Sequence, residues 1–411
     1  MKKIILTLFA TIITLSAIAQ TDIWYWKSGK AVKVSAVDSV TFTAPVEPED
    51  PPHHGSYPVV VSKGAYVVCG GNMSSNIDGS LSYYDYKTKT ASQKVFQTKN
   101  GRALGLTVTD ALIYGSKMYI VVDGEHSVEV VDAKTLQSIK RISMTELMGT
   151  EKGVHPRHIT CYDGMIYVST YGASKSAYGE GWSVTTEGNG YVAAIDTLTF
   201  SLKNTYDVGP FPEGLAAYNN RLYVCNSDYG ACTRASISII DLTQKKVVQT
   251  YTNENIVCPT VIAATGYGHY VLDMGNYADK ASGMFYIDAY DGRCSRLFDA
   301  SFVTFFDKYI YAVNAPYGAA KHDYIRYDIL SRVQNSFTQD GVFSPCGIGV
   351  DVSGHVFVAS YKKNPDTGSA NYSGNGYVAE YDETGVRVNE FDCGVGPNAI
   401  VFNTGIEYVN Y

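Results

Sequence analysis

The side chains of this sequence that could bind a metal ion or act as an acid or base are its histidines and the carboxylates of its predicted loops. Only two of the eight histidines, His155 and His158, lie close together on a predicted strand. A spacing of three on a strand directs two side chains to opposite faces, so this pair does not predict a shared metal site. The loop carboxylates that could supply an acid and a base, with no spacing that requires it, are Glu180, Glu187, Asp228, Asp279 and Asp366. Because the nucleophile-elbow, phosphate-loop and zinc-protease motifs are also absent, we predict no catalytic residue, no metal site and no cofactor.

Aromatic and amide side chains favour binding instead. Tyrosine is the compositional outlier, with 34 of 411 residues against 15 Phe and 3 Trp. Rigid aromatic planes with amides between them suit an uncharged, partly planar ligand such as a sugar or a macrocycle. The alternative is that these tyrosines pack the loops onto one another. The predicted contacts at the starts of loops and in the longer loops are Tyr171, Trp182, Tyr229, Tyr277, Tyr317, Tyr361 and Asn72.

A sevenfold repeat supplies the elements that would position these side chains. In each repeat, a strand-like segment centred on an aromatic residue is followed 13 to 29 residues later by a second segment that ends in Asp. These aspartates recur every 40 to 64 residues. No convincing helical period lies between, so the sequence predicts an all-β fold, a seven-bladed β-propeller of four-stranded blades. Each Asp opens a tight turn and is predicted to accept backbone N–H bonds there, a structural role. The seven are Asp85, Asp132, Asp196, Asp241, Asp288, Asp328 and Asp382.

The two ends of the repeat array complement each other. The C-terminal stretch 396–401 reads as the first strand of a blade with no second strand after it, whereas the first repeat lacks a good first strand. We therefore predict that the C-terminal strand joins the N-terminal blade, which removes the exposed sheet edges of an open array.

Loop length varies at one place in the repeat, between the second and third strands of each blade. Those loops and the links between blades emerge on the same face because strands alternate in direction, and insertions on one face often mark a binding surface. Several predicted inner strands begin with Pro, and the following residue is expected at the mouth of the central channel on this face. Of these, Arg157, Glu213 and Asn398 are predicted ligand contacts, although Arg157 and Glu213 could instead form an ion pair with each other.

The N-terminal region predicts export. Residues 1–19 contain Lys2 and Lys3, an apolar core and Ala17-Ile18-Ala19, which is typical of a signal peptide cleaved after Ala19. Residues 20–44 are predicted to form a small hairpin, 45–57 a Pro-rich acidic linker, and 58–411 the propeller. The residue after the cleavage point is Gln20 and not a Cys that could carry a lipid, and no transmembrane segment is predicted, so we expect an unlipidated protein in the periplasm, secreted or at the cell surface.

Net charge bears on the expected partners, and cysteine content bears on possible disulfides. Without the two signal lysines the chain has 31 basic and 40 acidic residues, a net charge of −9 with no basic cluster, so nucleic acid is not an expected partner. Disulfides are possible among the eight cysteines of an exported protein, and Cys225 and Cys232 could close one loop, but spacing leaves the pairing open.

Several phrases carry a resemblance to known propellers. Arg221-Leu-Tyr-Val-Cys-Asn-Ser and Ser238-Ile-Ile-Asp-Leu-Thr243 resemble the YVTN-type repeat of YncE-like seven-bladed propellers. Gly71-Asn72-Met73 and Tyr114-Gly-Ser-Lys-Met-Tyr-Ile-Val121 are similar to exported propellers of the Bacteroidetes. Some relatives capture cobalamin at the cell surface and deliver it to an outer-membrane transporter, which implies a corrinoid ligand. Those relatives are lipoproteins, a feature that this sequence lacks. Blade repeats define a fold more closely than a ligand.

Together these features predict a non-catalytic extracytoplasmic propeller that binds a small neutral ligand, cobalamin-like or glycan, on its elaborated face. Two alternatives remain at this stage. One is a protein–protein interaction platform that uses the same face, with an outer-membrane or surface protein as partner. The other is a hydrolase or lyase that depends on the loop carboxylates.

Overall fold

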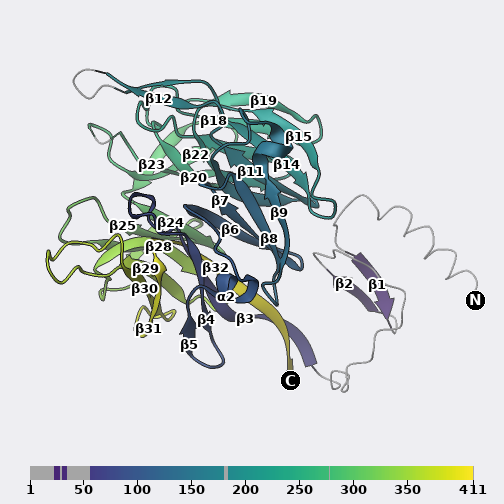
Figure 1. The fold of residues 1–411 in the computed structure, drawn as a ribbon, viewed down its shortest axis with the longest axis vertical. Helices are drawn as coiled ribbons and strands as arrows, with labels where there is room; N and C mark the ends of the chain where they lie inside the picture. The colour runs from purple at the N-terminus through teal and green to yellow at the C-terminus, as the bar shows by residue number, and fades with distance from the viewer. Residues whose placement is uncertain (1–22, 28–29, 35–55, 180–183, 277, 411) are drawn as a thin grey trace, which may run out of the picture.

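The computed structural model describes residues 23–27, 30–34, 56–179, 184–276, 278–410. These residues form seven antiparallel sheets of four strands each, which follow one another around the molecule (Figure 1). The predicted seven-bladed propeller is therefore confirmed. The predicted signal peptide, most of the predicted linker, Trp182 and Tyr277 lie outside the described residues.

Each blade runs from an inner strand A to an outer strand D. The first four blades are β32 (Pro397–Asn410), β3 (Ser56–Cys69), β4 (Ser80–Asp85), β5 (Thr90–Ser92); β6 (Val108–Tyr114), β7 (Lys117–Val122), β8 (Ser127–Asp132), β9 (Ser138–Ser143); β10 (Pro156–Tyr162), β11 (Met165–Thr170), β14 (Tyr191–Asp196), β15 (Leu202–Asp207); and β16 (Pro212–Tyr218), β17 (Arg221–Asn226), β18 (Ser236–Asp241), β19 (Lys246–Tyr251).

The last three blades are β20 (Pro259–Ala264), β21 (Gly268–Asp273), β22 (Gly283–Asp288), β23 (Cys294–Phe298); β24 (Phe302–Phe306), β25 (Tyr309–Asn314), β26 (Asp323–Asp328), β27 (Val333–Ser336); and β28 (Ser344–Val350), β29 (Val356–Tyr361), β30 (Asn375–Tyr381), β31 (Arg387–Val395). Smaller elements are the hairpin β12 (Lys175–Tyr178) and β13 (Val184–Glu187), the hairpin β1 (Ile23–Lys27) and β2 (Lys30–Val34), and the short helices η2 (Met73–Ser75), α2 (Val95–Asn100) and α3 (Met144–Met148).

The hydrophobic core consists of seven clusters, and each cluster lies between two neighbouring blades. Strand B shows why. Side chains alternate across a strand, so Met118 and Ile120 of β7 pack toward blade 1, whereas Tyr119 and Val121 pack toward blade 3. All four are fully buried. A strand buried on both faces requires an apolar side chain at nearly every position, which is the repeated signal in the sequence.

The ring closes as predicted from the sequence. The C-terminal strand β32 pairs antiparallel with β3, with Val67 opposite Ile400, and becomes the inner strand of blade 1 (Figure 1). The core cluster between blades 7 and 1 then joins Val67 and Cys69 to Phe357 and Cys393. Blade 1 is thus held together by the two ends of the propeller.

The seven repeat aspartates have the predicted structural role. Six of them end strand C and accept the backbone N–H groups two and three residues further on, as Asp85 Oδ1 does from Lys87 and Thr88 at 2.9 and 2.8 Å. The seventh, Asp382, directly follows strand C and accepts from Thr384 and Val386. The turn bonds favour the ionised form and hold the pKa of Asp85 below its usual value.

Two faces result from this arrangement. The loop face carries the B–C loops and the links between blades, including the β12–β13 hairpin of blade 3. The turn face carries the short A–B and C–D turns. No helix in the described part of the chain is long and apolar enough to cross a membrane.

The N-terminal hairpin and the cysteines complete the description. Strands β1 and β2 pair with Ile23 opposite Val34, while the predicted domain boundaries before the propeller remain predictions. All eight cysteines are free thiols. Cys225 is buried on β17 and Cys232 approaches Gly275 O at 3.9 Å, so the loop closure considered for this pair is not formed.

Candidate ligand-binding site

Six of the seven inner strands share an irregularity at their first residues. Their register against strand B shifts after the first or second position, as between Pro156 and Ile159 or between Pro212 and Leu215. Such bulges redirect side chains and are common next to functional sites. The residues within the shifts include the three contacts predicted at the channel mouth, Arg157, Glu213 and Asn398. Thr109, His158, Thr260 and Cys346 lie within the same shifts.

Arg157 connects three blades at this mouth. Its Nη1 donates to Asp123 Oδ2 at 2.7 Å and its Nε to Glu213 Oε2 at 3.3 Å. Its guanidinium lies 4.8 Å from the ring centre of Tyr171, a cation–π distance, and the Tyr171 hydroxyl donates to Glu213. Arg157, Glu213 and Tyr171, which the sequence proposed as separate contacts, therefore form one cluster. The ion pair between Arg157 and Glu213 that the sequence left open is formed.

His158 extends the cluster on its other side. Its Nδ1 pairs with Asp110 Oδ2 at 3.1 Å and its Nε2 with Glu213 Oε2 at 3.2 Å. Burial alone would lower the pKa of His158, but the two carboxylates raise it to about 9. Glu213 shows the reverse balance, because burial opposes ionisation while Arg157 and His158 lower its pKa to about 2. At neutral pH these groups are paired ions.

This pairing limits the chemistry of the mouth. A general acid or base needs a pKa near the working pH, and Glu213 has been moved away from it. Tyr171 is held neutral, because burial and then the neighbouring Glu213 raise its phenol pKa well above the usual value. The cluster can orient a ligand through fixed charges and hydrogen bonds, which is a binding property.

The other predicted contacts are dispersed over the loop face. Tyr229 and Tyr317 are 53% and 97% exposed. Tyr361 packs edge-on against Tyr372, and the Asn72 amide donates to Tyr372 O at 3.0 Å, so these residues join the loops of blades 7 and 1. Asn398 donates to Val108 O at 2.9 Å and links the inner strands of blades 1 and 2.

Two of the loop carboxylates hold the loops together. Asp228 is buried and accepts the backbone N–H groups of Thr233 and Arg234 at 2.8 and 2.6 Å, as well as the hydroxyl of Thr186 from blade 3. Asp279 accepts from Asn276 Nδ2 at 2.8 Å.

Four polar residues of the mouth were missed in the sequence: Asp110, Asp123, His126 and His155. His155 was considered only together with His158, whereas its Nδ1 bonds Asp123 Oδ1 of blade 2 at 2.8 Å. The available signal was position, because Asp123 directly follows a strand B and His155 directly precedes a Pro that starts a strand A. Both positions predict a place on the loop face close to the channel.

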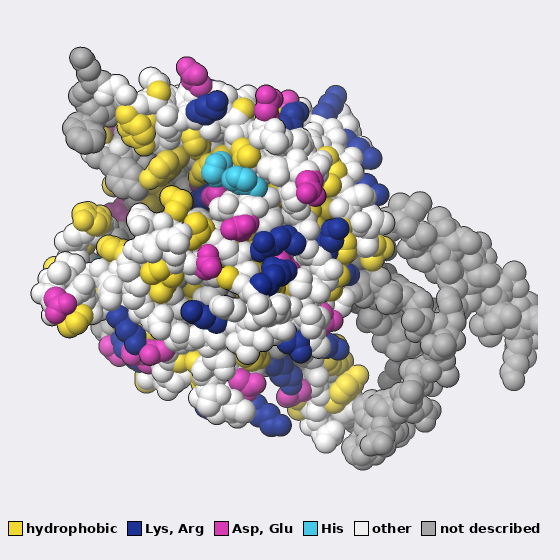
Figure 2. Space-filling model, viewed as in Figure 1, with side chains coloured by type: hydrophobic (Ala, Val, Ile, Leu, Met, Phe, Trp, Pro, Cys, Tyr) yellow, Lys and Arg dark blue, Asp and Glu magenta, His cyan; other side chains and the backbone are white. Residues whose placement is uncertain are grey.

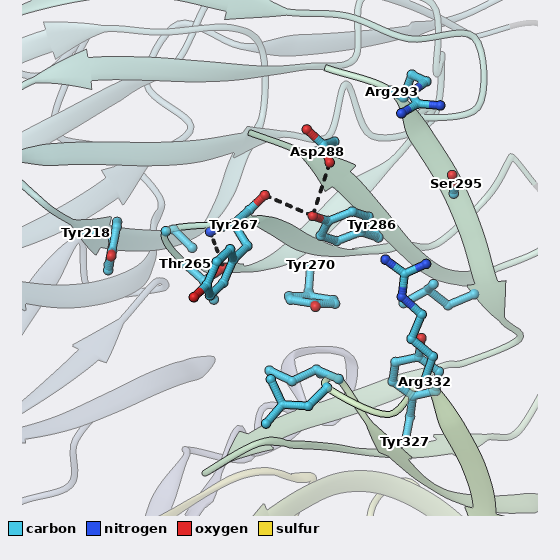
Figure 3. A pocket seen from close by; sticks show the side chains of 15 residues that line it. Tyr218, Thr265, Tyr267, Tyr270, Tyr286, Asp288, Arg293, Ser295, Tyr327 and Arg332 are labelled. Carbon is cyan, nitrogen blue, oxygen red and sulfur yellow. Dashed lines mark hydrogen bonds between the residues drawn. The ribbon is translucent and has the colours of Figure 1, made fainter. Parts of the chain in front are cut away.

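The turn face contains a cavity of about 930 Å³ beneath blades 4 to 6 (Figure 3). Tyrosines and arginines of different blades surround it, and the Tyr286 hydroxyl donates to Tyr267 O at 2.9 Å. None of the predicted contacts that the structure describes lines this cavity. Its principal side chains are Tyr218, Tyr267, Tyr270, Tyr286, Tyr327, Arg293 and Arg332.

Comparisons with known proteins support the fold. The profile of a family described as a domain of unknown function (DUF5074) matches residues 63–266, just under half of the chain. A functionally unknown protein from Desulfotomaculum acetoxidans is similar at 11% identity and a TM-score of 0.55, covering 83% of this chain and 99% of its own. No curated protein matches the sequence.

Two further solved structures share the architecture. Hydrazine synthase of Kuenenia stuttgartiensis is 15% identical, with a TM-score of 0.51 over 72% of this chain and 93% of the other. Apo AztD from Citrobacter koseri is 11% identical, with a TM-score of 0.50 over 84% and 99%. Since an enzyme is among these structures, the propeller fold alone does not decide between binding and catalysis.

Proposed function

We propose that this protein is a non-catalytic, extracytoplasmic binding propeller that captures a small neutral ligand on its loop face. A corrinoid is the first candidate, because the sequence resembles exported propellers of which some capture cobalamin. A neutral glycan is the second. Export is inferred from residues 1–19 of the sequence.

The observation that carries this proposal is the combination of exposed aromatics and a fixed polar cluster on one face. Tyr229 and Tyr317 present their rings to solvent from the B–C loops of blades 4 and 6. Arg157 and Glu213 lie at the channel mouth on the same face, held by partners from neighbouring blades. Apolar planes beside a few pre-oriented polar groups are the usual composition of a site for an organic ligand. Because the charges of the mouth are already paired, a neutral ligand fits better than an ionic one.

The chemistry of the mouth supports binding over catalysis. Glu213, the most buried carboxylate there, is fully ionised and paired at neutral pH. Asp228, a loop carboxylate considered as an acid or base, is committed to backbone N–H groups. Neither group is available to exchange protons with a substrate.

The test is a calorimetric titration of the mature protein with cyanocobalamin and with a panel of neutral oligosaccharides, all in EDTA. We expect one member to bind, and Tyr229→Ala combined with Tyr317→Ala to weaken it at least about ten-fold, as buried aromatic contacts commonly do. Tyr267→Ala combined with Tyr290→Ala is the matched control, since both tyrosines are exposed on the turn face.

Two outcomes would contradict the proposal. One is the absence of binding by every member of the panel together with co-purification of a stoichiometric protein partner, which would favour an interaction platform. The other is binding that only the turn-face variant weakens, which would move the site to the cavity of Figure 3.

A further inference from the structure

We propose that Asp123, His126 and His155 form a binding site for a divalent transition-metal ion, with zinc as the leading candidate. One ligand atom from each residue lies within 4.8 Å of the others. The three come from two blades: Asp123 and His126 bound the B–C turn of blade 2, and His155 precedes strand β10 of blade 3. The site is on the loop face, beside the charged channel mouth.

The contacts within the cluster show how close the three side chains already lie to one another. His155 Nδ1 and Asp123 Oδ1 are 2.8 Å apart and now share a proton. His126 Nδ1 accepts the backbone N–H of His155 at 3.1 Å, and the two imidazole rings lie edge to face with centres 4.8 Å apart. Donor atoms of a tetrahedral zinc site with bonds of about 2.1 Å lie roughly 3.4 Å from each other. An ion that replaces the shared proton would therefore need only small side-chain movements.

The donor set favours a transition metal over calcium or magnesium. Two imidazole nitrogens and one carboxylate oxygen suit zinc, cobalt and nickel, whereas calcium and magnesium prefer oxygen ligands alone. Three protein ligands leave at least one coordination position for water or an exchangeable ligand. This combination describes an open site.

The surroundings supply the support that a metal ligand needs. Arg157 Nη1 donates to Asp123 Oδ2 at 2.7 Å, which leaves Oδ1 directed at His155 and fixes the orientation of the carboxylate. Asp123 is buried, whereas His126 is partly exposed and His155 is exposed, so the site opens to solvent. On the face drawn in Figure 2, the visible histidine side chains form a single patch with acidic and hydrophobic side chains beside it. An ion can therefore enter without rearrangement of the blades.

Both histidines also have an unusual backbone conformation. His126 and His155 have positive φ values of 46° and 56°. This left-handed conformation is uncommon for residues other than glycine, although histidine adopts it more readily than most. His126 lies in the short B–C turn of blade 2, and His155 directly precedes β10, so both rings are carried by backbone adjoining a strand end.

The experiment is a titration of tag-free, EDTA-stripped protein with Co²⁺, followed by its visible absorption, and then displacement by Zn²⁺. We expect one Co²⁺ per chain. Loss of an outer-sphere partner typically costs about 10- to 100-fold in affinity. His126 and His155 are proposed as ligands themselves, so His126→Ala and His155→Ala should each lower affinity at least ten-fold. His322→Ala, in the B–C loop of blade 6, is the control and should leave the affinity unchanged.

A second variant separates loss of metal binding from loss of folding. His155→Gln keeps a side-chain N–H that can donate to Asp123 but removes the imidazole, so it should fold normally and still lose Co²⁺. Absence of Co²⁺ binding by the unaltered protein, or equal binding by the His126 and His155 variants, would overturn the inference. Because the organic-ligand titrations are run in EDTA, the failure of either proposal leaves the other intact.

Discussion

The channel mouth on the loop face and the cavity on the turn face are both rich in aromatic and charged side chains, yet they are built differently. At the mouth, Tyr171 and Arg157 are bound to Glu213, and bulged inner strands fix their positions. In the cavity, Tyr267 is 83% exposed, and the guanidinium of Arg332 has no ion pair within the described residues. The channel mouth holds its polar groups in fixed positions, whereas the turn face offers a large cavity.

The comparison shows that long loops and a large cavity need not mark the same region of the propeller. The turn-face cavity arises where the ends of neighbouring blades diverge, and short turns built around Asp288 and Asp328 border it. The mouth arises where inner strands converge and charges must be neutralised by partners from adjacent blades. We assign ligand recognition to the second kind of region because specificity depends on fixed polar groups more than on space.

The largest effect should come from breaking the charge cluster at the mouth. Glu213→Gln removes the buried carboxylate that pairs with Arg157 and His158 and leaves these two partly buried cations less compensated. We expect the free energy of unfolding to fall by about 3 kcal/mol, as is common when one partner of a buried ion pair is lost. Urea denaturation measures it.

The matched change on the turn face is Tyr286→Phe, which removes the hydroxyl bonded to Tyr267 O. This variant should lose about 1 kcal/mol or less, because a neutral, solvent-accessible hydrogen bond contributes little. Equal losses for Glu213→Gln and Tyr286→Phe would contradict the difference drawn between the two regions.

A smaller effect should appear as a pH dependence that belongs to the mouth alone. The pKa of His158 is raised to about 9 in the folded state, from 6.5. Its contribution is therefore complete below pH 6.5 and is lost as pH rises toward 9. We expect about 1 to 2 kcal/mol of stability to disappear across this window, less than the full pKa shift implies because the side chain is partly solvated.

The measurement is the difference in unfolding free energy between the unaltered protein and His158→Gln at pH 6 and at pH 9. The difference should be largest at pH 6 and should shrink at pH 9. A difference that is constant across the window would mean that His158 is not charged in the folded state.

A further small effect concerns the repeated turns. Asp196→Ala removes the acceptor for the N–H groups of Leu198 and Thr199. We expect a loss of about 1 kcal/mol in the free energy of unfolding, and a smaller loss for Asp196→Asn, which keeps an acceptor oxygen. Ligand binding on the loop face should not change, because this turn lies on the opposite face. A change in ligand affinity for either variant would show that the two faces are coupled.

The fold could be predicted because its signals are local and repeated. The apolar strand B and the Asp at the end of strand C recur in every blade, and each works within its own few residues. The closure by β32 followed from counting unmatched strands at the two ends. These features need no knowledge of distant contacts.

The site could be predicted only in part because its contacts cross between blades. The position of Arg157 after Pro156 placed it at the mouth, but Asp123 lies 34 residues earlier and meets it only when the ring forms. The pairing of His126 with His155 depends on the same packing of blades 2 and 3. The turn-face cavity had no signal in loop length, because Tyr267 occupies one of the shortest connections in the chain.

The measurement that tests the central claim most directly is hydrogen–deuterium exchange of the protein with and without its bound ligand. Our account predicts ligand-induced protection in the B–C loops, in particular residues 171–179, 227–235 and 315–322, and at the inner-strand starts around Arg157 and Glu213. Protection confined to the turns around Tyr267, Asp288 and Arg332, with the B–C loops unchanged, would place the ligand on the opposite face and contradict the account.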